Sequence, residues 1–289
     1  MRKSLKNPVI KELVDLKLVN LKNCSVISKT TRDKKIKVLQ DKKSGIIFLE
    51  KFVRDKKYYQ LDRKMSQKDI ARYTNLLKND DKRRFNQFKN VLKSKRILDF
   101  GCEFGGFLKN ITNSKKLHGL EINKNCIKFL KKKEINVIDN LENNKLKFDV
   151  ITMFHVLEHL PNQINILKRL RQNLDNNGKI IIEVPSASDL LISFKNLKSF
   201  KKFTFWSEHI ILHTRDSLKK VLKASGFKNI RVINFQRYNL NNHLGWFLNN
   251  SPGGHLIFKD IYDEELNAAY SDFLVRKNKT DTLIAIANK

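Results

Sequence analysis

Cysteine is scarce in this chain of 289 residues, which contains only three cysteines. Cys24, Cys102 and Cys126 form no C-x-x-C pair, so the sequence indicates neither a disulfide framework nor a cysteine-based zinc site. Long apolar runs are missing as well. No stretch approaches the roughly 18 consecutive apolar residues that a membrane-spanning helix needs, and charges interrupt the apolar stretches of residues 1–17. We therefore expect no transmembrane segment and a cytoplasmic location.

Acidic residues are few, because 29 Asp and Glu residues face 59 Lys and Arg residues, which gives a net charge of +30. A polycation gains affinity for phosphates by counterion release, so the charge alone favours a nucleic-acid partner. However, the excess is mostly lysine and is spread over nearly every predicted helix, with clusters near residues 80–84 and 195–203 and no recognisable RNA-binding module. We interpret it as solvated surface and do not expect a nucleic-acid partner.

The chain is predicted to have three parts. Residues 1–60 form a small N-terminal segment with a hairpin near residues 35–52, and residues 61–93 form a helical connector with apolar residues at helical spacing from 66 to 92. In residues 94–289, short aliphatic runs alternate with amphipathic segments, which is typical of βαβ units and a parallel sheet in an α/β fold.

Seven strands and four helices are expected in this last part. The predicted strands are 96–100, 117–122, 136–139, 148–154, 179–185, 229–235 and 281–287, and the predicted helices are 104–112, 125–133, 163–174 and 215–224. Gly178 is the expected cap after the third helix, and Thr214 the expected N-cap of the fourth. The insertion 236–278 before the last strand contains the least helix-like stretch of the chain, and it is too long for an ordinary connection.

A glycine-rich turn follows the first of these strands in ILDFGCEFGGFL, residues 97–108. Gly101, Gly105 and Gly106 would let the backbone approach a ligand at the carboxyl ends of the strands. Glu121 ends the next strand about 20 residues after Gly101, where a carboxylate can accept the ribose hydroxyls of a nucleoside. Asp139 ends the third strand, where an adenine amino group could be met. The turn does not match the G-x-G-x-x-G pattern of dinucleotide-binding enzymes.

These residues resemble motif I and its successors in class I S-adenosylmethionine-dependent methyltransferases. The resemblance implies a Rossmann-like sheet of seven strands, mainly parallel with the last strand antiparallel, and S-adenosylmethionine as the cofactor. It departs from the family at Glu103, which replaces the usual middle glycine and leaves a non-catalytic, cofactor-binding protein as an alternative. The expected cofactor contacts are Asp99, Gly101, Cys102, Glu103, Phe104, Gly105, Gly106, Glu121, Ile122, Asp139, Phe154 and His155.

The fourth strand ends in MFHVLEHLP, which places His155, Glu158 and His159 just beyond its carboxyl end. Methyl transfer is an in-line displacement that needs alignment and, for a hydroxyl or acidic carbon, a group that removes a proton. Histidine titrates near neutrality, so His159 is a candidate base and Glu158 a candidate catalytic partner. Alternatively, His155 packs under the cofactor and Glu158 caps the next helix. In some methyltransferases with a similar segment, related positions hold a divalent metal; we predict no metal here.

A second aromatic and polar segment, FTFWSEHIILHTRDSL, covers residues 203–218. It resembles a segment that forms part of the acceptor pocket in the same methyltransferases. His209 is therefore the second candidate base, and Trp206 a candidate substrate contact. Helix-entry packing is the alternative for this segment.

The insertion should emerge on the cofactor side of the sheet and roof the acceptor. Its planar donors and aromatic rings suit a polyhydroxylated or anionic substrate, and the candidates are Arg237, Tyr238, Asn242 and His243. The alternative is a structural cap. With the ending DTLIAIA, the stretch is similar to bacterial methyltransferases of lipopolysaccharide and surface-glycan biosynthesis, and residues 1–60 resemble a zinc-ribbon segment without its ligands.

These expectations combine into a methyltransferase of polysaccharide biosynthesis that acts on a sugar nucleotide or glycan. The alternatives are an RNA methyltransferase, which the charge would suit, and a non-catalytic protein. The sequence does not predict the oligomeric state.

Overall fold

The structure is a computed structural model that describes residues 7–53, 66–138, 140–141 and 145–289. Its first part contains a helix, a short 3₁₀ turn, three strands and one long helix: α1 (Pro8–Asp15), η1 (Leu21–Asn23), β1 (Cys24–Ser28), β2 (Val38–Asp41), β3 (Ile47–Leu49) and α3 (Gln67–Leu92). The next part runs through β4 (Arg96–Phe100), α4 (Gly106–Lys109), β5 (Lys116–Leu120), α5 (Lys124–Lys132), β6 (Asn136–Ile138), β7 (Phe148–Phe154), η2 (Leu157–His159), α6 (Gln163–Asn173) and β8 (Leu174–Pro185).

The last part begins with two short helices and a short strand, which are α7 (Leu190–Ser193), α8 (Lys198–Thr204) and β9 (Ile211–Leu212). It continues through α9 (Arg215–Ala224), β10 (Lys228–Phe235), α10 (Leu240–Asn249), α11 (Gly254–Ile257), η3 (Lys259–Ile261), α12 (Glu264–Arg276) and β11 (Thr282–Asn288).

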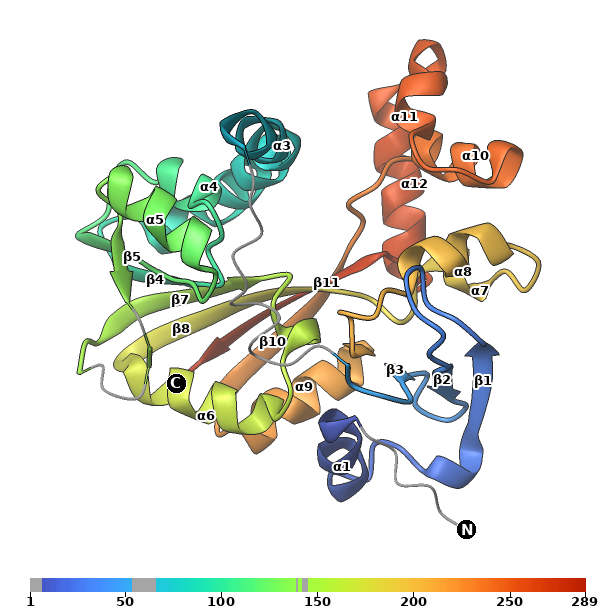
Figure 1. The fold of residues 1–289 in the computed structure, drawn as a ribbon, viewed down its shortest axis with the longest axis horizontal. Helices are drawn as coiled ribbons and strands as arrows, with labels where there is room; N and C mark the ends of the chain where they lie inside the picture. The colour runs from blue at the N-terminus through green and yellow to red at the C-terminus, as the bar shows by residue number, and fades with distance from the viewer. Residues whose placement is uncertain (1–6, 54–65, 139, 142–144) are drawn as a thin grey trace.

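The central sheet has seven strands in the order β10-β11-β8-β7-β4-β5-β6. Strands β4 to β8 pair in parallel, whereas β11 is antiparallel to both of its neighbours, β8 and β10. The predicted fold, with its antiparallel last strand, is therefore confirmed. Helices α6 and α9 cover one face, and α3, α4 and α5 cover the other (Figure 1). Because both faces are covered, the inner strands are nearly continuous aliphatic runs, as in Ile180–Ile182.

Local signals place several helix boundaries. Helix α3 begins at a capping box in which Ser66 and Asp69 exchange hydrogen bonds, and Thr214 caps α9 as predicted. The expected cap at Gly178 is wrong. Helix α6 already ends at Asn173, and Gly178 lies inside β8, because the chain enters the sheet directly after the helix.

The N-terminal residues pack against the rest of the chain. Strands β2 and β3 form the expected antiparallel hairpin, and β9 completes a sheet in the order β1-β2-β3-β9. Leu13 of α1 lies in the same hydrophobic cluster as Ile210 and the central sheet. The division of the chain at residues 60 and 93 stays a prediction.

The insertion before the last strand is mostly helical, which corrects our expectation of little helix there. Asn239 caps α10 by accepting a hydrogen bond from the Asn242 amide, and Trp246 of α10 is 3% exposed. Helices α10, α11 and α12 project together from one end of the sheet (Figure 1). In the described part of the chain, no helix is both long and apolar enough to span a membrane.

Candidate functional site

The loop between β4 and α4 is shaped by glycines that cannot carry a side chain. Gly101 has a φ of +78°, and a Cβ atom there would lie 2.4 Å from Cγ2 of Val156. Gly105 has a φ of +69°, and its Cβ would lie 2.8 Å from Leu130 and Ile135 side-chain atoms. Positive φ and the close neighbouring side chains both require glycine, so these two residues fix the shape of the loop.

Glu121 follows β5 and is tied to the same loop. Its Oε1 accepts hydrogen bonds from the amides of Ile122 (2.7 Å) and Asn123 (2.8 Å), and its Oε2 accepts one from the Glu103 amide (3.0 Å). A carboxylate offers about four acceptor positions, so one remains on Oε2 for a ligand hydroxyl. The carboxylate therefore fixes the loop and can also accept a hydrogen bond from a ribose hydroxyl. Ile122, the next expected cofactor contact, is half-buried.

Glu103 occupies the position at which the family carries glycine. Its φ is +46°, a left-handed conformation that explains the family's preference for glycine. Its side chain accepts a hydrogen bond from the hydroxyl of Tyr73 on α3 at 2.9 Å. Helix α3, through Tyr73, thus holds the Glu103 side chain that replaces the family's glycine.

The other expected cofactor contacts are mostly interior. Asp99 is 4% exposed and accepts a hydrogen bond from the Thr152 hydroxyl at 2.7 Å, and burial raises its pKa to about 7. Cys102 and Phe104 are buried. The Phe154 ring stacks on Phe88 and meets Phe107 edge-on. The interior side of the loop is therefore packed by four of the expected contact residues: Asp99, Cys102, Phe104 and Phe154. Asp139, the expected contact of the adenine, lies outside the described residues.

The loop fits S-adenosylmethionine on these observations. The glycines hold the turn after β4 in its conformation, and Glu121, at the end of the next strand, has an acceptor position that a ribose hydroxyl could fill. Gly106 meets a different neighbour, because its Cβ would lie 2.1 Å from Oδ2 of Asp81 on α3. Helix α3 thus closes one side of the loop.

A buried charged network lies at the carboxyl ends of β7 and β8. Glu183 of β8 has a fully buried side chain and receives two hydrogen bonds from Arg83, at 2.9 and 3.0 Å, and two from Arg84, at 3.1 and 2.8 Å. His155, with a φ of +54°, contacts Glu183 through Nε2 at 3.2 Å and Glu158 through Nδ1 at 3.2 Å. Burial alone would lower the pKa of His155, but hydrogen bonds to Glu158 and Glu183 raise it.

Arg83 and Arg84 are not among the site residues expected from the sequence, because they belong to a charge cluster that we interpreted as solvated surface. Arg84 is 7% exposed. Arg237 was expected to contact substrate, yet its guanidinium pairs with Asp80 beside the same network. The available signal was the mixture of two acids and two arginines within one helical turn, which suits an internal network better than a uniformly basic face.

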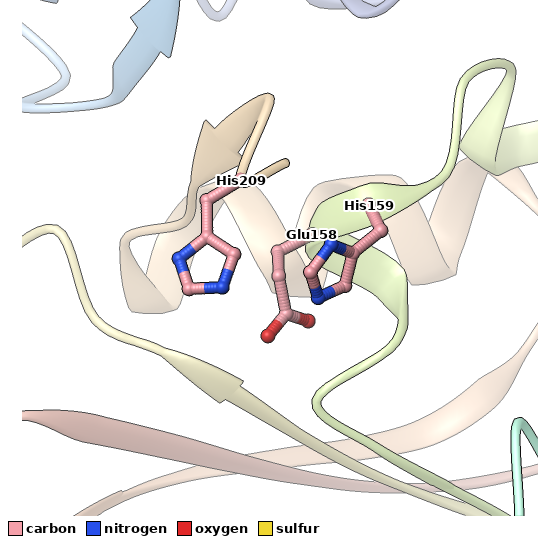
Figure 2. A group of neighbouring side chains, drawn as sticks. All are labelled: Glu158, His159 and His209. Atoms are coloured by element: carbon pink, nitrogen blue, oxygen red, sulfur yellow. The ribbon is translucent and has the colours of Figure 1, made fainter. Parts of the chain in front are cut away.

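The two candidate bases, His159 and His209, lie beside Glu158. Glu158 and His159 follow β7, His209 precedes β9, and one ligand atom from each lies within 4.8 Å of the others (Figure 2). Burial and the neighbouring charge of His159 lower the pKa of His209 to about 3. Although burial opposes it, the hydrogen bond with His155 and the charges of His159, His155 and His209 hold the pKa of Glu158 at about 2. Glu158 does not cap α6, which begins after Asn162 without a side-chain cap.

An aromatic wall borders this cluster. The Trp206 ring lies 5.6 Å from the His209 ring and 6.4 Å from the His159 ring. The Arg32 guanidinium lies over the Phe203 ring at 4.3 Å and over the Trp206 ring at 5.6 Å. No sequence pattern around Arg32 predicts this position. Trp206 is partly accessible and therefore suits the expected contact with an acceptor.

Two of the expected substrate contacts, Asn242 and His243, are buried in the interior of the insertion. His243 is 1% exposed, with Nδ1 at 2.7 Å from the Tyr270 hydroxyl and Nε2 at 3.3 Å from the Gln236 amide. Asn242 is 7% exposed, whereas Tyr238 is 45% exposed. The contacts of His243 favour a structural role, and Tyr238 is the accessible member of this set.

The family comparison points to one enzyme class. A family model described as a methyltransferase domain matches residues 62–232, which is more than half of the chain.

Curated relatives match a smaller region. A tRNA U34 carboxymethyltransferase from Aliarcobacter butzleri (strain RM4018) is 26% identical over 157 residues, covering 49% of this chain and 50% of that protein. The enzyme of the same name from Campylobacter jejuni subsp. jejuni serotype O:2 is 25% identical over 166 residues, covering 50% and 54%. The chain thus spans about half the length of the curated relatives it matches, and these relatives do not support the expected polysaccharide-associated subgroup.

Solved structures share the fold. A SAM-dependent methyltransferase from Archaeoglobus fulgidus has a TM-score of 0.50 at 21% identity, covering 75% of this chain and 94% of that one. A phosphoethanolamine N-methyltransferase 2 from Haemonchus contortus has a TM-score of 0.52 at 17% identity, covering 82% and 61%. At these identities the likeness concerns the fold alone.

Proposed function

Because the chain belongs to the methyltransferase-domain family and is an S-adenosylmethionine-dependent methyltransferase, we propose that it methylates a hydroxyl group of a small, sugar-type acceptor. The observation that carries this proposal is the cluster of Glu158, His159 and His209 beside the partly accessible Trp206. An aromatic face and imidazole acceptors suit the apolar face and the hydroxyl groups of a sugar.

The proposed reaction assigns one task to each group. When bound, S-adenosylmethionine supplies a methyl group on a positively charged sulfur, which keeps the electron pair of the broken bond. An imidazole of His159 or His209 takes the proton of the acceptor hydroxyl while its oxygen forms the new bond to the methyl carbon. Burial and the charge of His159 hold the pKa of His209 at about 3, so its imidazole is neutral at pH 7 and can accept a hydrogen bond that orients the acceptor hydroxyl. A group with so low a pKa is a weak base, so of the two imidazoles we assign removal of the proton to His159.

The charge of the helical insertion favours a small acceptor over a polynucleotide. Between residues 236 and 278 there are four basic residues against five acidic ones, in a chain of net charge +30. The insertion is connected to the cluster, since Trp246 packs against Phe203 at 5.0 Å and Arg32 lies over both Phe203 and Trp206. This nearly neutral part of the chain therefore offers a phosphate backbone little of the attraction that the net charge of the whole chain suggests.

RNA is the second candidate acceptor. The names of the curated relatives and the net charge favour it, and Arg32, Trp206 and Phe203 could stack an unpaired base. However, the relatives match at about one quarter identity over about half of their length. Similarity of this extent gives little support to a common acceptor.

Methyl-labelled S-adenosylmethionine separates the two candidates. The intact chain is incubated with a pool of sugar nucleotides or with total tRNA, and both S-adenosylhomocysteine and labelled acceptor are measured. We expect label in the sugar-nucleotide fraction, with at least tenfold less in the His209→Ala variant. Label that enters tRNA and is released by ribonuclease would establish the RNA alternative and contradict the proposal.

A further inference from the structure

Three side chains at the acceptor side form a ligand set for a metal ion. Glu158 and His159 come from the turn after β7, and His209 comes from the segment before β9, more than 45 residues later. Figure 2 shows the carboxylate of Glu158 between the two imidazoles. The two imidazole rings lie 4.9 Å apart with their planes at 73°, so their nitrogens do not stack face to face.

One oxygen of the buried Glu158 carboxylate lacks a hydrogen-bond partner among the described residues. Glu158 is 0% exposed, and its Oε1 lies 3.2 Å from Nδ1 of His155. Within the described part of the chain, its Oε2 has no hydrogen-bond partner. A buried, ionised oxygen without a partner is costly, because water no longer solvates it. A cation at Oε2 would remove this cost.

We propose that Glu158, His159 and His209 bind a divalent transition-metal ion such as Zn²⁺. Two imidazoles and one carboxylate suit such ions, and three protein ligands leave a coordination position for a further oxygen. Around a tetrahedral Zn²⁺ the ligand atoms would lie about 3.3 Å apart, which follows from bonds of about 2.0–2.1 Å. The ligand atoms lie within 4.8 Å of one another, so they would have to approach by up to about 1.5 Å to hold the ion.

The surrounding residues already orient the carboxylate. His155 holds Oε1 of Glu158, and Glu183, which receives hydrogen bonds from Arg83 and Arg84, holds the other side of His155. Such outer contacts commonly fix the orientation of metal ligands. The charged network that we describe at the ends of β7 and β8 would therefore serve to keep Glu158 aimed at the ion.

The ion would bear on the acceptor chemistry. This consequence rests on the proposed function: a divalent ion beside the acceptor would lower the pKa of a hydroxyl bound to it, so that the proton leaves more readily. With the ion bound, His159 and His209 would be ligands and not bases, so the proton of the acceptor hydroxyl would pass to solvent. The imidazole base of the proposed function would then act only in the chain without the ion. Ion binding itself does not depend on the identity of the acceptor.

Metal titration of the intact, untagged chain tests the proposal without any turnover. After dialysis against chelator, the protein is titrated with Zn²⁺ by calorimetry and with Co²⁺ by visible absorption, in the absence of cofactor and acceptor. We expect one ion per chain and a Co²⁺ absorption band of a site with nitrogen ligands. His209→Ala and Glu158→Gln should each weaken binding at least tenfold, whereas His255→Ala, at an exposed histidine outside the cluster, should not.

The outcomes separate this proposal from the proposed function. Stoichiometric binding that His209→Ala weakens supports the site even if no sugar acceptor is methylated. Absence of Zn²⁺ and Co²⁺ binding, or binding that both cluster variants leave unchanged, overturns it, even if methyl transfer proceeds in chelator. Thermal unfolding of each variant in chelator shows whether it is folded, and Glu158→Gln, which keeps the side-chain size, serves where His209→Ala does not fold.

Discussion

Replacing Glu121 should weaken S-adenosylmethionine binding by a predictable amount. Its Oε2 has one acceptor position left after the hydrogen bond from the Glu103 amide at 3.0 Å. A hydrogen bond from a ribose hydroxyl to a carboxylate contributes about 1.5–3 kcal/mol, so its loss should raise the dissociation constant about 10- to 150-fold. Glu121→Ala also removes the acceptor of the Ile122 and Asn123 amides, which places the result at the upper end of this range.

Isothermal titration calorimetry of the wild type and Glu121→Ala with S-adenosylmethionine measures the change. Glu265→Ala, which removes an exposed carboxylate on α12, is the matched control and should leave the dissociation constant unchanged. Urea unfolding without ligand reports any loss of stability separately. An unchanged dissociation constant in a folded Glu121→Ala protein would refute the assignment of this carboxylate to the cofactor.

Three further predictions concern the loop, the charged network and pH. Gly101→Ala places a Cβ atom 2.4 Å from a Val156 methyl group at positive φ. Urea unfolding should therefore show a loss of about 1–3 kcal/mol in the free energy of unfolding, and calorimetry should show a loss of cofactor affinity. Wild-type values for both would contradict the role of the β4–α4 loop in cofactor binding. Arg84→Ala leaves the buried Glu183 carboxylate with fewer donors and should cost about 3–5 kcal/mol, with a smaller cost when Glu183→Gln is added; strict additivity in this double-mutant cycle would show that the pair is not coupled. Burial and the charge of Asp281 raise the pKa of Asp189 to about 8 in the folded chain, whereas its pKa in the unfolded chain is about 4. Between these two pH values the unfolded state loses the Asp189 proton first, so the folded state becomes less stable relative to it as pH rises. The stability of Asp189→Asn relative to wild type should therefore increase between pH 5 and 8, by up to about 1.4 kcal/mol per pH unit, and then level off; a difference that does not vary with pH would show that Asp189 is ionised throughout.

The sheet was predictable because its strands are buried on both faces. Runs such as RILDF and FDVITMF are short, aliphatic and bounded by turns, and β4 and β7 have the predicted bounds. The glycine loop was predictable for a related reason, since Gly101 and Gly105 occupy backbone conformations that other residues rarely adopt.

The partners of the charged network were not predictable from the sequence, although the mixture of acids and arginines in residues 80–84 was compatible with such a network. Arg84 and Glu183 lie 99 residues apart, and a run of acids and arginines on an otherwise polar helix has no period that signals burial. The helical insertion was missed because Asn and Gly have low helix propensity, whereas the Asn239 cap and the burial of Trp246 stabilise α10 in the folded chain. Tertiary contacts decided both cases.

The proximity of His209 to Glu158 and His159 was only partly predictable from the sequence. The sequence placed each residue at the carboxyl side of the sheet, but the separation of their ligand atoms depends on how the segment before β9 packs against η2. The backbone hydrogen bond from the Ile210 amide to the Glu158 carbonyl, at 2.9 Å, fixes that packing.

Titration of the intact chain with S-adenosylmethionine is the most direct test of the cofactor site. We predict one binding site per chain, competition by S-adenosylhomocysteine, and a dissociation constant that rises at least tenfold in Glu121→Ala but not in Glu265→Ala. A folded wild-type protein that binds neither compound would contradict the assignment of the β4–α4 loop and Glu121 to the cofactor.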